Sequence, residues 1–222
     1  MVWTALGTSL LFGALAMAVV NRPRWSDGRL WVAFAVGGAL FFAAQFVSRP
    51  VAALAAVLLG PLPEDAPGWP LVAVLVALAE LFKLTTALVL HQAYRMDAGR
   101  GAAVGAAVGA GFGVWSEAVI LNSVFQVARL GLPGGSSLGA AVAASLARVL
   151  ANTASTGLGA HLAASGRLWA GLLTAGGVQL ALDPGLRMVA VRAEWATALT
   201  LLVGGGAFAA LVACGAGRSG CR

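Results

Sequence analysis

Residues 70–93 read PLVAVLVALAELFKLTTALVLHQA, and residues 101–128 read GAAVGAAVGAGFGVWSEAVILNSVFQVA. Each stretch is long enough to cross a bilayer as a helix, which takes roughly 17–25 apolar residues. Each also carries one glutamate near its middle, Glu80 or Glu117. A charge at that depth costs about 2.5–3.5 kcal/mol on insertion scales and marks a functional site by default. The two stretches therefore predict spanning helices that bury a polar site.

The composition of the whole chain is that of an integral membrane protein. Its 222 residues are 60% hydrophobic and 10% charged, and the mean hydropathy is +0.90. Soluble domains carry about 25% charged residues. The predicted fold class is an all-α, polytopic transmembrane bundle that forms a single domain over residues 1–222.

Seven apolar runs predict about seven membrane-spanning helices, with six or eight as alternatives. The sixth run is short and contains glycine, so it is expected to be tilted or partly re-entrant, and Pro184 is expected to end it. The runs cover residues 3–20, 30–47, 70–93, 101–128, 137–163, 168–182 and 196–214.

The break from Ser48 to Pro70 contains five prolines. Proline lacks a backbone donor and disrupts helix interiors, so no long helix is expected throughout this break. Its apolar stretch Val51–Leu59 is too short to span and is predicted to lie on the outer surface.

The basic charge of the chain, +6 at neutral pH, indicates membrane anchoring rather than nucleic-acid binding. The arginines lie singly or in small groups in the breaks between apolar runs, and there is no basic tract. Eight lie on one predicted side of the membrane and four on the other, which predicts the N-terminus outside and the C-terminus inside. The eight are Arg22, Arg24, Arg29, Arg95, Arg100, Arg167, Arg218 and Arg222; the four are Arg49, Arg129, Arg187 and Arg192.

Two of the predicted helices place polar groups on a buried face. Lys83 follows Glu80 by three residues, so the two side chains share a helix face and can form an ion pair. Glu117 follows a series of glycines spaced every four residues from Gly101 to Gly113. Small residues at this spacing allow another helix to approach closely. Glu117, with Asn122 as a further candidate, is therefore expected to face protein rather than lipid.

Two later helices offer matching polar faces. Arg148 and Asn152 are followed by Ser155 at helical spacing, and Gln179 and Asp183 are four residues apart. Exposing any of these groups to lipid has a large free-energy cost. The four polar faces are therefore predicted to converge on one pocket. The faces carry no histidine or cysteine, so no metal site is expected, and no cofactor-binding motif is present.

The segment Ala79-Glu80-Leu81-Phe82-Lys83, then a basic loop, Gly105 to Gly113 and Glu117-Ala118, resembles the glutamic-type intramembrane proteases of the YhfC and PrsW kind. These proteases are distant relatives of the CAAX prenyl endopeptidases, and the resemblance covers about residues 30–183. It implies that Glu80 is the general base and Glu117 a second carboxylate. It implies Lys83, Arg148 and Asn122 as charge-holding pocket residues. It implies Asn152, Gln179 and Asp183 as donors to an oxyanion or substrate.

The chain departs from this family at three positions. Ala79 replaces a glutamate, and the amides Asn152 and Gln179 replace two histidines. An amide can donate a hydrogen bond but cannot exchange a proton near neutral pH, as imidazole can. The acid–base chemistry would therefore rest on Glu80 and Glu117.

The sequence leaves three functions open, and with them the question of whether the chain is an enzyme. The first is hydrolysis of membrane-embedded or membrane-proximal peptides. The second is a catalytically inactive relative that binds transmembrane segments of partner proteins. The third is a small ion- or proton-coupled transporter, although no internal repeat supports it. The expected surroundings are the lipid bilayer of the bacterial inner (plasma) membrane and a membrane-anchored protein or peptide, without nucleic acid.

Overall fold

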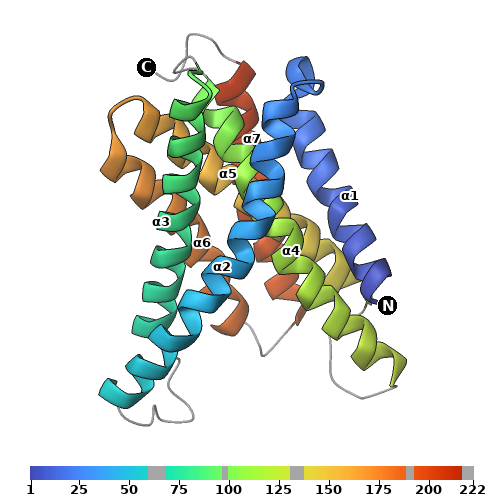
Figure 1. Cartoon of the computed structure of the whole chain (residues 1–222). Helices are drawn as coiled ribbons and strands as arrows, with labels where there is room; N and C mark the ends of the chain where they lie inside the picture. Colours follow the sequence, from blue (N-terminus) through green and yellow to red (C-terminus); the bar gives the residue numbers. More distant parts are fainter. Residues whose placement is uncertain (60–68, 97–99, 131–137, 189–192, 217–222) are drawn as a thin grey trace.

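The computed structural model describes residues 1–59, 69–96, 100–130, 138–188 and 193–216. Over these ranges the chain is helical and contains no strand, which confirms the all-α prediction (Figure 1). The elements are α1 (Val2–Val20), η1 (Arg22–Arg24), α2 (Gly28–Leu59), α3 (Trp69–Ala93), α4 (Gly101–Arg129), α5 (Leu138–Ala164), α6 (Leu168–Met188) and α7 (Ala193–Ala216).

Five of these helices, α1 to α5, are long and apolar enough to cross a membrane. Within the described residues, α6 and α7 contain shorter apolar segments, Leu168–Leu182 and Ala198–Ala213. The outer surface is also apolar: Trp3, Phe46 and Trp169 are each more than three-quarters exposed. Large exposed apolar surfaces mark contact with a membrane or partner. The protein is therefore an integral membrane protein whose helices contact the bilayer.

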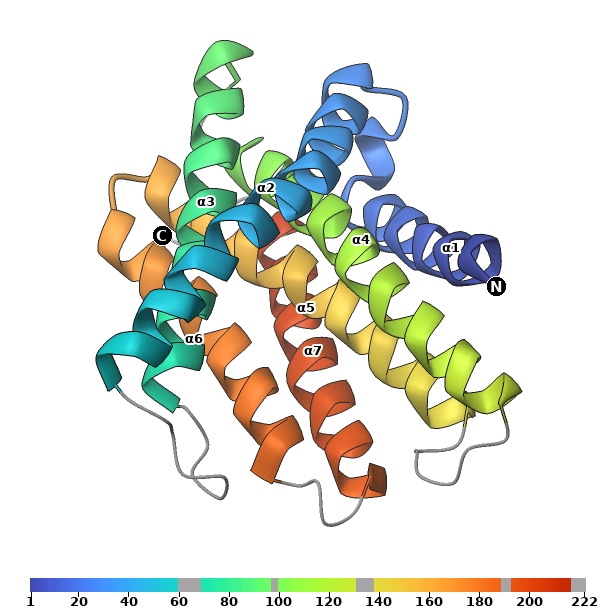
Figure 2. The same cartoon turned by 60° about the horizontal axis from the view of Figure 1, so that its bottom comes forward.

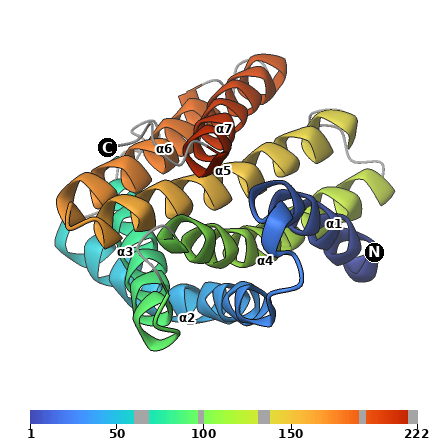
Figure 3. The same cartoon turned by 90° about the horizontal axis from the view of Figure 1, so that it is seen from above.

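Helix α4 lies at the centre of the bundle, between α2 and α5 (Figure 3). Its most apolar segment is 78% buried, whereas that of α1 is 33% buried. Helices α6 and α7 pack beside α5, on the side away from α2 (Figure 2). The two central helices, α4 and α5, therefore hold the side chains that are farthest from lipid.

The glycines of α4 allow its backbone to approach that of α5. A Cβ atom added at Gly105 would lie 2.5 Å from the Thr156 carbonyl oxygen. At Gly109 an added Cβ would overlap the carbonyl oxygen of Asn152. The predicted small-residue seam therefore forms between α4 and α5, and only glycine fits at these two positions.

Helix α2 extends farther than the predicted run 30–47, because it continues as one helix through Pro50 to Leu59. Its candidate membrane span ends at Val51, so the placement of Val51–Leu59 on the outer surface stays a prediction. Proline removes only its own backbone donor, so the turns after it can still form their hydrogen bonds, at a cost of roughly 3 kcal/mol. Helix α6 similarly continues past Pro184 to Met188. In both helices the apolar sequence continues the helix despite the proline.

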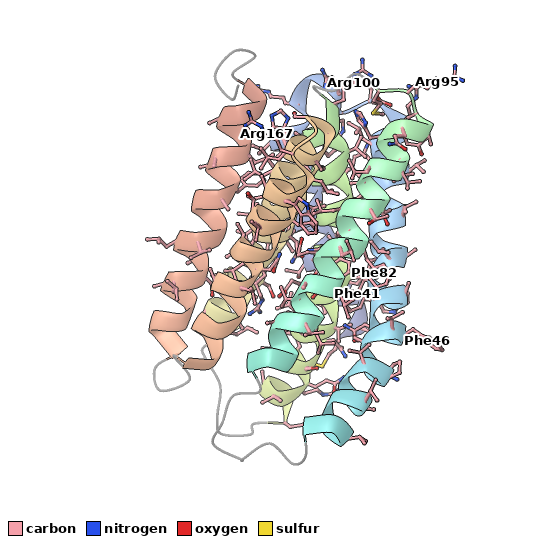
Figure 4. The ribbon with its side chains drawn as sticks, turned by 90° about the vertical axis from the view of Figure 1, so that its left-hand side faces the viewer. Phe41, Phe46, Phe82, Arg95, Arg100 and Arg167 are labelled. Carbon is pink, nitrogen blue, oxygen red and sulfur yellow. The ribbon has the colours of Figure 1, made fainter. Side chains whose placement is uncertain are left out.

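One end of the bundle carries several arginines. Figure 4 shows Arg95, Arg100 and Arg167 together at the upper end. These three residues belong to the group of eight that the sequence places on one side of the membrane.

Candidate functional site

Glu80 and Glu117 lie inside the bundle, with side chains that are 2% and 1% exposed. On α3 the buried residues Glu80, Lys83, Leu84 and Ala87 follow helical spacing and form one inward face. Leu81, between them in sequence, is 47% exposed. The helix therefore directs its charged groups into the protein and its leucine toward lipid.

Lys83 is paired with three groups at once. Its ammonium group forms an ion pair with Glu80 one turn earlier on α3. It also donates a hydrogen bond to Asn152 Oδ1 at 2.8 Å and lies 4.9 Å from the centre of the Phe112 ring. A cation over an aromatic face is attracted by the ring quadrupole. These contacts make Lys83 the link from α3 to α4 and α5.

Glu117 forms a second ion pair between α4 and α5. Arg148 Nε lies 2.9 Å from Glu117 Oε1, and Ser145 Oγ donates to Glu117 Oε2 at 2.6 Å. Both carboxylate oxygens are therefore engaged by side chains of α5. A buried charge needs such partners because an unpaired one is strongly destabilising.

The polar side chains of α5 connect these two ion pairs to each other and to α6. Asn152 accepts from Lys83 and donates through Nδ2 to the Arg148 carbonyl oxygen at 3.0 Å. Gln179 Nε2 on α6 donates to Ser155 Oγ at 3.3 Å, and Ser155 donates to the Asn152 carbonyl oxygen at 3.3 Å. The network thus joins α3, α4, α5 and α6 through α5.

A cavity of about 170 Å³ lies among these four helices. One liquid-like water occupies about 30 Å³, so the cavity has room for about five waters or a group such as a peptide unit. Glu80 Oε2 is buried and has no hydrogen-bond partner among the described residues. The lining residues are Val76, Ala79, Glu80, Lys83, Phe112, Ser116, Glu117, Ile120, Arg148, Asn152, Gln179 and Leu182.

The cavity brings together six of the eight site residues proposed from sequence: Glu80, Lys83, Glu117, Arg148, Asn152 and Gln179. Asn122 does not line it, which corrects its assignment to the pocket. The reason is angular: Asn122 lies about 140° around the helix from Glu117 in one direction, whereas the lining residues Ser116 and Ile120 lie in the other direction. Asp183 belongs to α6, but its side chain lies outside the described residues.

Sequence reasoning missed three polar or aromatic residues that contact or line this site: Phe112, Ser116 and Ser145. Ser145 precedes Arg148 by three residues, so helical spacing was enough to place it on the same face. Phe112 and Ser116 share a face four residues apart on α4, but that face is not the one that carries Glu117. Nothing in the spacing indicated that the cavity extends to it.

The cavity is lined by two carboxylate side chains, two amide side chains and two cationic side chains, and one carboxylate oxygen, Glu80 Oε2, has no hydrogen-bond partner among the described residues. In the described part of the chain, no group of three or more His, Cys, Asp or Glu residues is placed to hold a metal. Comparison with known proteins finds no matching family model, no matching curated protein and no matching solved structure. The chemistry of the cavity therefore has to be argued from its own residues.

Proposed function

We propose that this protein is an intramembrane hydrolase of the glutamic protease type, acting on membrane-embedded or membrane-proximal peptides. The observation that supports this function is Glu80 itself: the residue lines a cavity of about 170 Å³, and its buried Oε2 atom has no hydrogen-bond partner among the described residues. A general base must be able to accept a proton from a water molecule held beside it. Glu80 Oε2 accepts no hydrogen bond from the described residues, whereas both oxygens of Glu117 accept hydrogen bonds from α5.

In the proposed reaction, Glu80 takes a proton from water as the water oxygen attacks the peptide carbonyl carbon. The proton then passes to the leaving amine as the C–N bond breaks. Lys83 holds the Glu80 carboxylate through the other oxygen. The amide protons of Asn152 and Gln179 that are not used within the network are available to the oxyanion. Preorganised donors of this kind are commonly the largest catalytic contribution.

A second function, a catalytically inactive relative that binds transmembrane segments, is favoured by a different observation. Lys83, Asn152, Arg148 and Glu117 already engage one another, and Ala79 cannot supply a second carboxylate beside Glu80. A network that is satisfied in this way stabilises the bundle without needing a substrate.

Cleavage of a library of membrane-anchor peptides by the reconstituted protein tests both functions. We expect wild-type protein to cleave and Glu80→Gln to lose cleavage, because the amide cannot accept the proton. Asp27→Asn is the matched control: the partly exposed Asp27 side chain accepts a hydrogen bond from the Arg29 backbone N–H, which an asparagine oxygen can also accept, so this variant should cleave normally. Cleavage that survives Glu80→Gln would exclude Glu80 as the base.

Absence of cleavage together with retained peptide binding would favour the inactive relative. A proton or solute flux that Glu117→Gln abolishes would instead favour transport. The same proteoliposomes serve for all three readouts, so the functions are compared on one preparation.

We further propose the bacterial inner membrane as the location, with the N-terminus outside and the C-terminus inside. The support is the gathering of Arg95, Arg100 and Arg167 at one end of the bundle, since such loops are retained in the cytoplasm. Cysteine labelling from either side of the membrane tests the orientation, at Ser165→Cys, an exposed position between α5 and α6, in a chain whose native Cys214 and Cys221 are replaced by serine. Labelling from outside would reverse it.

A further inference from the structure

A second cavity, of about 300 Å³, lies between α2 and α3 beside the polar site. The two cavities share four lining residues: Val76, Ala79, Phe112 and Ser116. Figure 4 shows Phe41 and Phe82, which line it, at similar height in the bundle, and Phe46 pointing outward from α2. We call this second cavity the α2–α3 groove.

The groove lies between two candidate membrane spans. Its α2 residues belong to the candidate span Gly28–Val51 and its α3 residues to the span Ala73–Ala93. Among the described residues no charged side chain lines it; its walls are mainly apolar, with Gln45 and Ser48 among the few polar groups. The neighbouring Phe46 is 83% exposed and Phe42 is 51% exposed. The groove is therefore continuous with the surface that contacts the bilayer.

The dimensions of the groove decide what fits in it. An α-helix about 10 Å wide, rising 1.5 Å per residue, occupies about 120 Å³ per residue. The groove would hold only two or three residues of such a helix. By contrast, a methylene is close in size to a water, so about ten of them fill the same volume. From Phe41 to Ser48 the groove follows α2 for about 10 Å, which suits a chain of that length.

The polarity of the walls excludes an extended peptide as well. An unwound peptide in hydrocarbon must pair each N–H and C=O, and each unpaired group costs several kcal/mol. The groove offers few partners, and one of them, the Ser48 hydroxyl, already donates to the Gln45 carbonyl oxygen at 3.1 Å. An acyl chain has no such requirement.

We propose that the α2–α3 groove binds one acyl chain of a membrane phospholipid, lying along α2 and α3 with its inner end beside the Glu80 cavity. The chain contacts Phe41, Leu78 and Phe82 and fills a space that would otherwise stand empty next to the polar site. This lipid site does not depend on whether the polar cavity is catalytic.

Photocrosslinking of the full chain in nanodiscs tests the proposal. The probe is a phosphatidylcholine with a diazirine in the middle of one acyl chain, and crosslinked peptides are mapped by mass spectrometry. We expect the yield on residues 41–48 and 75–82 to exceed the yield on the lipid-facing side of α1, where Leu11 is 58% exposed.

Two variants that narrow the groove should reduce the crosslink. Ala44→Leu and Leu75→Phe each displace roughly two methylenes of the bound chain, which predicts about a tenfold lower yield. Leu11→Phe, on the exposed face of α1, is the control and should leave the yield unchanged. Leu75 is only half-buried, so Leu75→Phe keeps the test decisive if Ala44→Leu disturbs folding.

Three results would overturn the proposal: equal yields on the groove and on α1, a yield that neither groove variant lowers, or displacement of the lipid only by peptide and not by unlabelled phospholipid. Glu80→Gln should crosslink like wild type. Loss of hydrolysis in that variant therefore does not count against the lipid site. Failure of the proposed hydrolase function and failure of the proposed lipid site can thus be told apart.

Discussion

Substitution of Gly105 by alanine provides a quantitative test of the close approach of α4 to α5. The added Cβ would lie 2.5 Å from both the Thr156 carbonyl oxygen and the Ala160 Cβ, whereas real contacts of this kind begin at 3.0–3.4 Å. The two backbones must therefore separate by about 0.5–0.9 Å, which is the difference between these distances. Overpacking of this size costs about 1–3 kcal/mol, partly offset by the higher helix propensity of alanine. We expect Gly105→Ala to destabilise the bundle by about 1–2 kcal/mol.

Reversible unfolding in mixed micelles with increasing SDS measures this free energy, and two further glycines provide a graded comparison. At Gly113 an added Cβ would lie 3.1 Å from the Asn152 Cβ, and at Gly176 it would meet nothing within 4 Å. The expected order of stability is therefore Gly176→Ala above Gly113→Ala above Gly105→Ala. If Gly105→Ala unfolds at the same SDS fraction as Gly176→Ala, the seam does not set the helix spacing and the reasoning is refuted.

The same unfolding assay tests three further features. Lys83→Met should lower the free energy of unfolding by about 3–5 kcal/mol, because it leaves a buried carboxylate unpaired. Adding Glu80→Gln to this variant should recover much of the lost stability. Strictly additive losses of stability in the double variant would contradict the ion pair. Ser145→Ala should lower the stability by about 1.5–3 kcal/mol, because it removes a hydrogen bond to a buried charge. The control Ser123→Ala, on an exposed part of α4, should change the stability by less than about 0.5 kcal/mol. Equal effects of the two substitutions would argue against the hydrogen bond of Ser145. Pro50→Ala should stabilise α2 by about 1 kcal/mol or more by restoring a backbone donor, and no gain would mean that the freed carbonyl is already satisfied.

The features that follow from helical periodicity were predictable from the sequence. The ion pair of Glu80 and Lys83 follows from their spacing of three residues, and the burial of Glu117 follows from the glycine series before it. Both depend only on the angle between residues on one helix. Contacts between helices were harder to predict from the sequence. It indicated that Asn152 is polar and buried, but not that its amide joins Lys83 to the Arg148 backbone.

The errors have equally specific causes. The second apolar run was predicted to end before Pro50. The helix continues past it, because a single missing backbone donor is tolerated when the sequence on both sides is helical and apolar. Asn122 was grouped with Glu117 for its polarity, although it lies about 140° away around α4. The α2–α3 groove depends on how α2 and α3 pack against each other and against α4, and no residue pattern within one helix encodes that packing.

The two ion pairs have different consequences for how the chain enters the membrane. Glu80 and Lys83 lie on one helix, so α3 can insert already neutralised. Glu117 and Arg148 lie on successive helices, and either helix inserted alone would carry an uncompensated charge costing about 2.5–3.5 kcal/mol. Only eight residues separate the end of α4 from the start of α5. Biogenesis should therefore proceed with α3 as an independent segment and with α4 and α5 entering together as a helical hairpin.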